Sequence, residues 1–291
     1  MDRERPGPSH EGGLPLLQSH DEYLTTPDGL RLFTRRCAYA DPAAEIVLAH
    51  GFGEHSGRYT ALVEHLSAHN IAVTVYDHRG HGKSEGLEGH VDRFSDYVDD
   101  LDLFISRVRV EDHPRRLFVI GHSMGGLIAL GYAAAHGERV DGMVISAPLL
   151  GVAAPIPPLK LMTGRIAARL MPRLRLHNGL NPSHLSRSPE VALAYTSDPL
   201  VNFRVSARWF TEATKAMSEV MEAAPRILLP MLILQGGEDR IACPGTTRQF
   251  VRRLGSSDKE FGLYQGLYHE LFNEPEKYEI YDRVSRWLEA H

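Results

Sequence analysis

The chain has 291 residues, of which 43% are hydrophobic and 24% are charged, a composition typical of a globular protein with one large core. Its net charge of -5 provides no general attraction to nucleic acid, so we expect no nucleic-acid partner. The two cysteines, Cys37 and Cys243, match neither a disulfide framework nor a zinc motif, which favours a cytoplasmic protein without a bound metal.

The N-terminal segment, residues 1–14, is rich in proline, glycine and charged residues and lacks the apolar stretch of a signal peptide. It is therefore predicted to be a disordered leader. Residues 23–26 and 30–34 flank a Pro-Asp-Gly turn, a pattern typical of a β-hairpin. No apolar stretch approaches the roughly 18 residues of a membrane-spanning helix, so any contact with lipid is expected to be peripheral.

From residue 45 onward, short apolar strands alternate with amphipathic helices. Strands are predicted at 45–49, 71–76, 116–120, 142–146, 230–234 and 259–264, and helices at 59–69, 94–110 (capped by Ser95), 127–133, 246–254 and 278–288. This alternation predicts an α/β fold in which a mostly parallel central sheet is covered by helices on both faces. Residues 15–147 and 226–291 form this predicted core, with functional loops expected at the carboxyl ends of the strands.

The alternation stops over residues 148–225, a stretch too long for an ordinary connection, which predicts a helical cap inserted over the active face. One face of a predicted cap helix is apolar and its flanks are basic: the apolar residues are Leu159, Met162, Ile166 and Leu170, and the basic ones are Lys160, Arg165 and Arg169. Residues 151–180 contain no acidic residue. Either the apolar face packs onto the body of the protein, or it lies at a membrane surface with its arginines against anionic head groups.

The most informative motif is Gly121-His122-Ser123-Met124-Gly125-Gly126, which lies between a predicted strand and a predicted helix. In this context G-x-S-x-G is typical of a nucleophile elbow, a tight turn that raises a serine hydroxyl above the sheet edge and needs flanking glycines. The alternative is a glycine-rich connection in which the serine is incidental. The elbow interpretation predicts Ser123 as the nucleophile.

A serine nucleophile needs a base that is itself oriented by a carboxylate, and in this topology the acid and then the histidine follow the serine along the chain. Asp239 follows the strand at 230–234, and His269 follows the strand at 259–264. Both are therefore expected at the same sheet edge as Ser123. The adjacent Glu238 is the alternative acid.

The oxyanion of a tetrahedral intermediate needs two N–H donors. One is expected from Met124, which follows the nucleophile at the start of a helix. The other is expected from the glycine-rich turn at 50–53, with Phe52 as the predicted donor. His122, beside the nucleophile, is expected to pack rather than to transfer protons.

Together these motifs resemble those of the monoacylglycerol lipase branch of the α/β-hydrolases, over nearly the whole chain after residue 22. The matching segments are 50–59 (HGFGEHSGRY), 77–86 (DHRGHGKSEG), the elbow, 185–187 (LSR) and 197–200 (SDPL). The resemblance implies a triad of Ser123, Asp239 and His269, the oxyanion donors Phe52 and Met124, and a glycerol-binding end shaped by Glu54, Arg58 and Tyr195. A local structural ion pair between Glu54 and Arg58 is the alternative.

One segment departs from that family pattern. After His269 the chain reads Glu270-Leu271-Phe272, with an aromatic residue where the mammalian members carry a second histidine, so the glycerol pocket is expected to be altered. The sequence thus predicts a serine hydrolase that cleaves monoacylglycerols, or other esters with a long acyl chain, without a cofactor. The alternatives are a lysophospholipase or broad carboxylesterase, a peptidase, and a hydrolase fold retained as a binding module.

Overall fold

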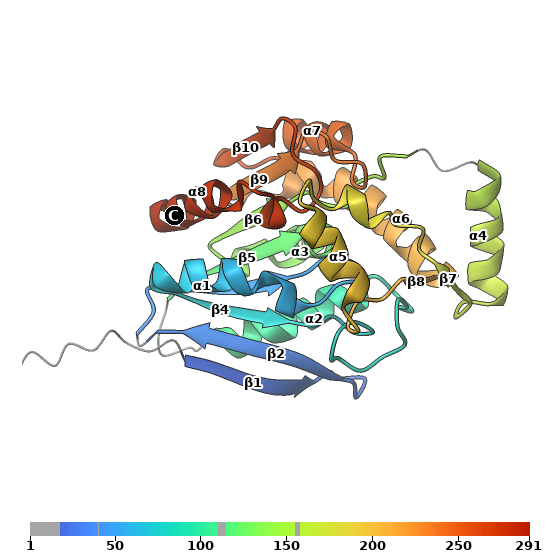
Figure 1. Cartoon of the computed structure of the whole chain (residues 1–291), viewed down its shortest axis with the longest axis horizontal. Coiled ribbons are helices and arrows are strands. Elements are labelled where there is room, and N and C mark those ends of the chain that lie inside the picture. Colours follow the sequence, from blue (N-terminus) through green and yellow to red (C-terminus); the bar gives the residue numbers. More distant parts are fainter. Residues whose placement is uncertain (1–17, 40, 110–114, 155–157) are drawn as a thin grey trace, which may run out of the picture.

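The computed structural model describes residues 18–39, 41–109, 115–154 and 158–291. An eight-stranded sheet forms its centre (Figure 1). In spatial order its strands are β1 (Gln18–Thr25), β2 (Arg31–Ala38), β4 (Ile71–Tyr76), β3 (Ala44–Ala49), β5 (Arg116–His122), β6 (Gly142–Ser146), β9 (Met231–Gly236) and β10 (Lys259–Tyr264). β2 is antiparallel to both β1 and β4, and the other neighbours are parallel. This arrangement confirms the predicted α/β fold with a mostly parallel sheet.

Helices cover both faces of the sheet. Successive residues of a strand point to opposite faces, so a strand with apolar residues at successive positions needs helices on each side to bury them. On one face lie α1 (Thr60–Ala68) and α8 (Lys277–Ala290), which share a core with Ile46 and Leu48 of β3. On the other face lie α2 (Ser95–Val108), α3 (Met124–His136) and α7 (Pro244–Arg253), which pack around Val47 and Ala49 of the same strand. Short 3-10 turns occur at Ser56–Tyr59, Gly137–Arg139, Pro182–His184, Ala224–Arg226 and Leu271–Asn273.

The predicted capping role of Ser95 was wrong. Ser95 is the first residue of α2, and Phe94 before it already has helical backbone angles (φ -63°, ψ -28°) without a side-chain cap. Because the chain turns into the helix one residue early, the carboxylate of Asp96 organises this end instead, accepting the N–H of Arg93 at 3.2 Å.

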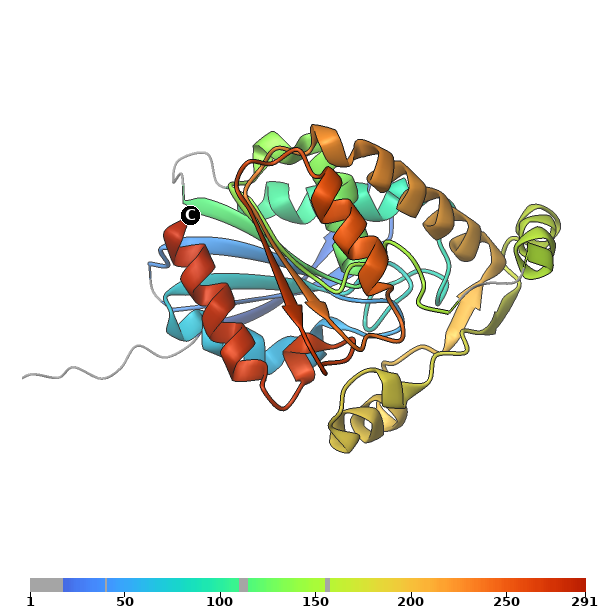
Figure 2. The same cartoon turned by 90° about the horizontal axis from the view of Figure 1, so that it is seen from above.

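The stretch between β6 and β9 holds α4 (Pro158–Leu170), β7 (Arg175–His177), α5 (Pro189–Ser197), β8 (Arg204–Ser206) and α6 (Ala207–Ala223). β7 and β8 form an antiparallel ribbon separate from the main sheet. α4 stands at the outer edge of the molecule, away from the sheet, in both views (Figures 1 and 2). The division into a core and a cap with boundaries at 148 and 225 stays a prediction.

α4 turns its apolar face away from the body of the protein. Met162, Ile166 and Leu170 are 55%, 53% and 74% exposed. The interpretation in which this face packs onto the body is therefore wrong for these three residues. Leu159 and Lys160 lie outside the residues whose side chains are described.

Small residues make the contact between α4 and α6 instead. Ala168 is buried, and a side chain at Gly164 would meet the ring of Phe210 on α6 at 3.7 Å. Small residues let two helices approach closely, so the side of α4 that carries them faces α6. This packing leaves the larger apolar residues of α4 exposed.

Candidate active site

Ser123 occupies a strained turn between β5 and α3. Its backbone angles are φ 54° and ψ -113°, a conformation that costs a non-glycine residue about 1–3 kcal/mol. The flanking glycines make the turn possible: a Cβ at Gly121 would lie 2.6 Å from the carbonyl oxygen of Gly125, and one at Gly125 would lie 2.0 Å from that of Ala49. The local structure is that of a nucleophile elbow.

The structure brings Ser123, His269 and Asp239 together in one hydrogen-bonded chain. Nε2 of His269 lies 2.9 Å from Oγ of Ser123, and Nδ1 lies 2.8 Å from Oδ2 of Asp239. The three residues are 7%, 3% and 5% exposed. Glu238 is exposed to solvent, so Asp239, and not the alternative acid, reaches the imidazole.

Hydrogen bonds hold the carboxylate of Asp239 in its charged form. Oδ1 accepts the N–H groups of Ile241 and Ala242 at 2.8 and 3.0 Å, and the Gln235 side chain donates to Oδ2 at 2.9 Å. Burial works to raise the pKa of Asp239, but His269 and the N–H groups of Ile241 and Ala242 hold that pKa below its usual value. In turn, burial works to lower the pKa of His269, and Asp239 raises it above its usual value, which suits a general base.

His122 packs against the triad as a neutral residue. Its ring centroid lies 4.8 Å from that of His269, and its Nδ1 lies 3.3 Å from Oγ of Ser146. Burial, together with the neighbouring His269, lowers the pKa of His122 to about 4. It therefore carries no charge at neutral pH.

The turn after β3 and the start of α3 supply the two expected main-chain donors. Within the described residues, neither the N–H of Phe52 nor that of Met124 has a protein acceptor. Met124 is the first residue of α3, where N–H groups are free to bind an anion. The centre of the Phe52 ring lies 4.2 Å from that of Trp209 on α6 and 5.2 Å from that of His81. These ring contacts hold the turn in place.

Glu54, Arg58 and Tyr195 also lie together. Arg58 donates to Glu54 at 2.7 Å, and its guanidinium carbon lies 4.9 Å from the centre of the Tyr195 ring. Glu54 and Tyr195 are 3% and 1% exposed. The structural ion pair considered as an alternative is present, and the Tyr195 hydroxyl has no partner within the described part of the chain. A role in substrate binding stays a prediction.

Glu270 is a further member of this site, and the sequence motifs did not predict it. Its carboxylate forms two hydrogen bonds with Arg58, at 2.6 and 2.8 Å. The signal that could have found it is a charged residue directly after His269 and before the apolar pair Leu271-Phe272. Phe272 is buried against the rings of Tyr59 and His122.

Two segments from the stretch between β6 and β9 are attached to the loops of the site. Oδ2 of Asp198, in the SDPL segment, lies 2.9 Å from Nε2 of His55, next to the turn that carries Phe52. Arg187, in the LSR segment, donates to the buried Glu274 at 3.1 Å, in the loop that carries His269. These contacts tie both segments to the loops that carry His55 and His269.

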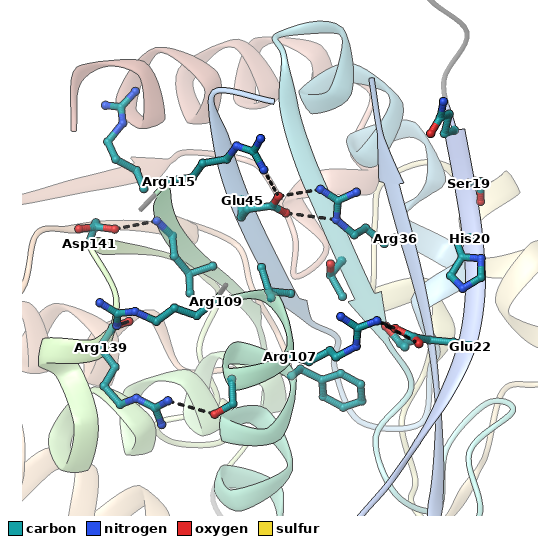
Figure 3. Close-up of a pocket in the computed structure, with 18 residues that line it drawn as sticks. Ser19, His20, Glu22, Arg36, Glu45, Arg107, Arg109, Arg115, Arg139 and Asp141 are labelled. Carbon is teal, nitrogen blue, oxygen red and sulfur yellow. Dashed lines mark hydrogen bonds and ion pairs between the residues drawn. The ribbon is translucent and has the colours of Figure 1, made fainter. Parts of the chain in front are cut away.

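A hollow of about 1160 Å³ lies at the amino-terminal ends of β3 and β5, whereas Ser123 follows the carboxyl end of β5 (Figure 3). Four of its arginines already pair with carboxylates: Arg36 with Glu45, Arg107 with Glu22, Arg115 with Asp41 and Arg139 with Asp102. No triad residue lines it, so we do not assign the reaction to this hollow. Across the described ranges, no group of three His, Cys, Asp or Glu side chains is arranged to hold a metal ion.

Comparisons with known proteins agree with this geometry. Residues 40–276 match the family described as serine aminopeptidase, S33. The chain is 34% identical to the monoacylglycerol lipase of Mycolicibacterium smegmatis, over 86% of this chain and 90% of that protein. It is 31% identical to phospholipase YtpA of Bacillus subtilis, over 86% and 96%. The crystal structure of Paleococcus ferrophilus monoacylglycerol lipase superposes with a TM-score of 0.80 at 32% identity, over 95% of this chain and 99% of that one.

Proposed function

We propose that this chain, which belongs to the serine aminopeptidase (S33) family and to the monoacylglycerol lipase group of α/β-hydrolases, hydrolyses monoacylglycerols to a fatty acid and glycerol. The observation that carries the proposal is the hydrogen-bonded chain from Ser123 through His269 to Asp239 at the carboxyl ends of β5, β10 and β9. The similarity of this chain to proteins named monoacylglycerol lipase supports monoacylglycerol as the substrate.

In the proposed reaction, Nε2 of His269 takes the proton of the Ser123 hydroxyl as its oxygen attacks the acyl carbonyl. The N–H groups of Phe52 and Met124 stabilise the oxyanion. The alcohol leaves with the proton from His269, and the acyl group stays on Ser123 as the acyl-enzyme. His269 then takes a proton from water, which attacks the acyl-enzyme and releases the fatty acid. Asp239 keeps the imidazole in the tautomer whose Nε2 is free to accept the proton.

We propose Tyr195 as the contact for the alcohol part of the substrate. Its buried hydroxyl lacks a partner among the described residues, and burial together with Glu54 raises its pKa, so it remains a neutral hydrogen-bond donor. A Cβ at Gly53, in the oxyanion turn, would lie 3.0 Å from this hydroxyl. Arg58, which pairs with Glu54, stacks its guanidinium on the ring of Tyr195.

A substrate panel tests this function. Purified protein is given monoacylglycerol, diacylglycerol and lysophosphatidylcholine with the same acyl chain, beside Ser123→Ala and the exposed serine variant Ser218→Ala as a matched control. We expect turnover of monoacylglycerol by wild type and by the control, and at least about a 1000-fold loss in Ser123→Ala. Faster turnover of lysophosphatidylcholine than of monoacylglycerol would instead indicate a lysophospholipase. The similarity of the chain to a phospholipase supports this alternative.

The charged residues beside the triad support a peptidase less well than an esterase. An aminopeptidase needs a free carboxylate for the substrate's ammonium group, and the buried carboxylates of Glu54 and Glu270 beside the triad both pair with Arg58. A binding module without activity is separated from all these enzymes by labelling with a fluorophosphonate, which reacts with an activated serine. No labelling of the wild-type protein would favour that module.

We further propose that α4 contacts membranes. Met162, Ile166 and Leu170 on α4 are exposed, as are Arg165 and Arg169 beside them, which is the pattern of a helix that lies at a lipid surface. The segment from 151 to 180 has no acidic residue to repel anionic lipids. None of the helices in the described ranges has the length and apolar character needed to cross a bilayer.

A further inference from the structure

Arg58 joins two buried carboxylates that come from different loops. Its Nη1 donates to Glu54 at 2.7 Å and to Glu270 at 2.6 Å, and its Nη2 donates to Glu270 at 2.8 Å. Both glutamate side chains are 4% exposed, and that of Arg58 is 10% exposed. Breaking one partner of a buried ion pair leaves an uncompensated charge, so these three residues, the buried ion cluster, are expected to move as one unit.

Each glutamate of the buried ion cluster is attached to a different part of the proposed machinery. Glu54 accepts the N–H of Gly51 at 2.6 Å, one residue before the proposed oxyanion donor Phe52. Glu270 directly follows His269 in the chain. The cluster therefore connects the turn that binds the oxyanion with the loop that carries the base.

Gly51 lies between the buried ion cluster and the nucleophile elbow, close to both. A Cβ at Gly51 would lie 2.8 Å from Oε1 of Glu54 and 3.3 Å from Cβ of Ser123. Only a glycine fits between the carboxylate and the serine. A shift of Glu54 would therefore be transmitted to both the oxyanion turn and the elbow.

The net charge of the buried ion cluster is negative, since two carboxylates face one guanidinium. The titratable side chains that face His269 are Asp239 after β9, His122 at the end of β5, Glu54 in the proposed oxyanion turn and Glu270 in its own loop. Against the lowering effect of burial, Asp239, Glu270 and Glu54 raise the pKa of His269. The cluster thus favours the imidazolium that forms when His269 takes the serine proton.

The cluster is poorly suited to bind a ligand by itself. Both oxygens of Glu270 are occupied, because Oε2 also accepts the side-chain N–H of Asn273 at 2.9 Å. The ring of Tyr195 covers the guanidinium of Arg58. These groups are satisfied within the protein, which points to a role in orienting other residues.

We propose that Glu270 is a positioning residue of the reaction: through Arg58 and Glu54 it holds the oxyanion turn in register with His269, and its charge supports the protonated imidazole. The inference rests on the proposed function. Displacements of about 1 Å at a reacting centre can cost about 100-fold in rate, so a residue that couples two reacting loops is expected to affect turnover without touching the substrate.

The test compares Glu270→Gln with a matched control, Glu260→Gln, which removes an exposed carboxylate of β10 that pairs with Arg283 of α8. Hydrolysis of a p-nitrophenyl ester is followed from pH 5 to pH 9. We expect kcat/KM of Glu270→Gln to fall about 10-fold or more. The acid limb of its profile should move to lower pH by about half a unit or more, because the pKa of His269 loses a supporting charge. Glu260→Gln should match wild type.

A second variant separates geometry from charge and covers a failure of Glu270→Gln to fold. Glu270→Asp keeps the charge but shortens the reach to Arg58, so its kcat/KM should fall several-fold while the acid limb keeps its wild-type position. Wild-type kcat/KM and an unmoved acid limb in a folded Glu270→Gln, or wild-type kcat/KM in Glu270→Asp, would overturn the inference. A wild-type protein without esterase activity or fluorophosphonate labelling would instead contradict the proposed function.

Discussion

Glu274 accepts the main-chain N–H of Tyr268 at 2.6 Å, and Tyr268 is the residue before His269. The same fully buried carboxylate accepts from Arg187, so it joins the 185–187 segment to the loop that carries His269. We expect Glu274→Gln to lower the free energy of unfolding by about 2 kcal/mol, because the charge-assisted hydrogen bonds to a buried carboxylate are weakened. It should also lower kcat/KM.

Glu276 offers the matched control for that variant, since it pairs with the same arginine but is 40% exposed. Glu276→Gln should change the unfolding free energy by less than about 1 kcal/mol, as exposed ion pairs contribute little. Urea unfolding of both variants checks the difference. Equal effects of the two substitutions would show that burial of Glu274 is unimportant.

The second prediction concerns the close packing behind the elbow. Gly125→Ala would place a methyl group 2.0 Å from the carbonyl oxygen of Ala49, which is backbone and has little freedom to move. We expect a loss of about 3 kcal/mol or more in unfolding free energy, together with loss of esterase activity.

Gly245→Ala, in α7, serves as the comparison for Gly125→Ala, because its nearest neighbour outside the helix backbone would be 3.6 Å away. Its unfolding free energy should be unchanged or higher by up to about 1 kcal/mol, since alanine favours helix. Thermal unfolding of both proteins measures the contrast. A Gly125→Ala protein as stable as Gly245→Ala would mean that the elbow is looser than described.

The third prediction is a pH profile. His269 acts as a base only when neutral, and its pKa is raised, so kcat/KM should fall as the pH drops through a value above 6.5. His122, with a pKa of about 4, is already neutral in that range. His122→Gln should therefore leave the midpoint of the acid limb in place. A shift of about one pH unit or more would mean that His122 takes part in the titration.

The fourth prediction tests the membrane contact of α4. We expect the wild-type protein to float with anionic liposomes, and Arg165→Gln/Arg169→Gln to float less, because it loses two charges that attract the head groups. Arg248→Gln/Arg252→Gln removes the same charge from exposed positions on α7 and should float like wild type. No binding of the wild-type protein to any liposome would remove this proposal.

The sequence predicted the sheet and the elbow well because both depend on local patterns. Runs such as 46–49 and 71–73 are apolar, and the strands that contain them are buried along their whole length, as strands covered on both faces of a sheet must be. The tight turn at Ser123 needs glycines at fixed spacing. The order of acid and histidine along the chain then directed attention to Asp239 and His269.

Contacts between distant segments were not accessible in the same way. Arg58 and Glu270 are 212 positions apart, and their pairing depends on how two loops meet at the sheet edge. Helical periodicity identified an apolar face on α4, but it could not show whether that face is buried or exposed. The contact through Gly164 and Ala168, which leaves that face exposed, follows from the placement of α6.

The most direct test of the account is to locate the reactive serine chemically. Wild type, Ser123→Ala and Ser218→Ala are treated with a fluorophosphonate, digested, and examined by mass spectrometry, and monoacylglycerol turnover is measured on the same samples. We predict a single adduct on Ser123 in wild type and in Ser218→Ala, with no adduct and no turnover in Ser123→Ala. Full turnover by Ser123→Ala, or an adduct on another residue in active wild-type protein, would contradict the proposed triad.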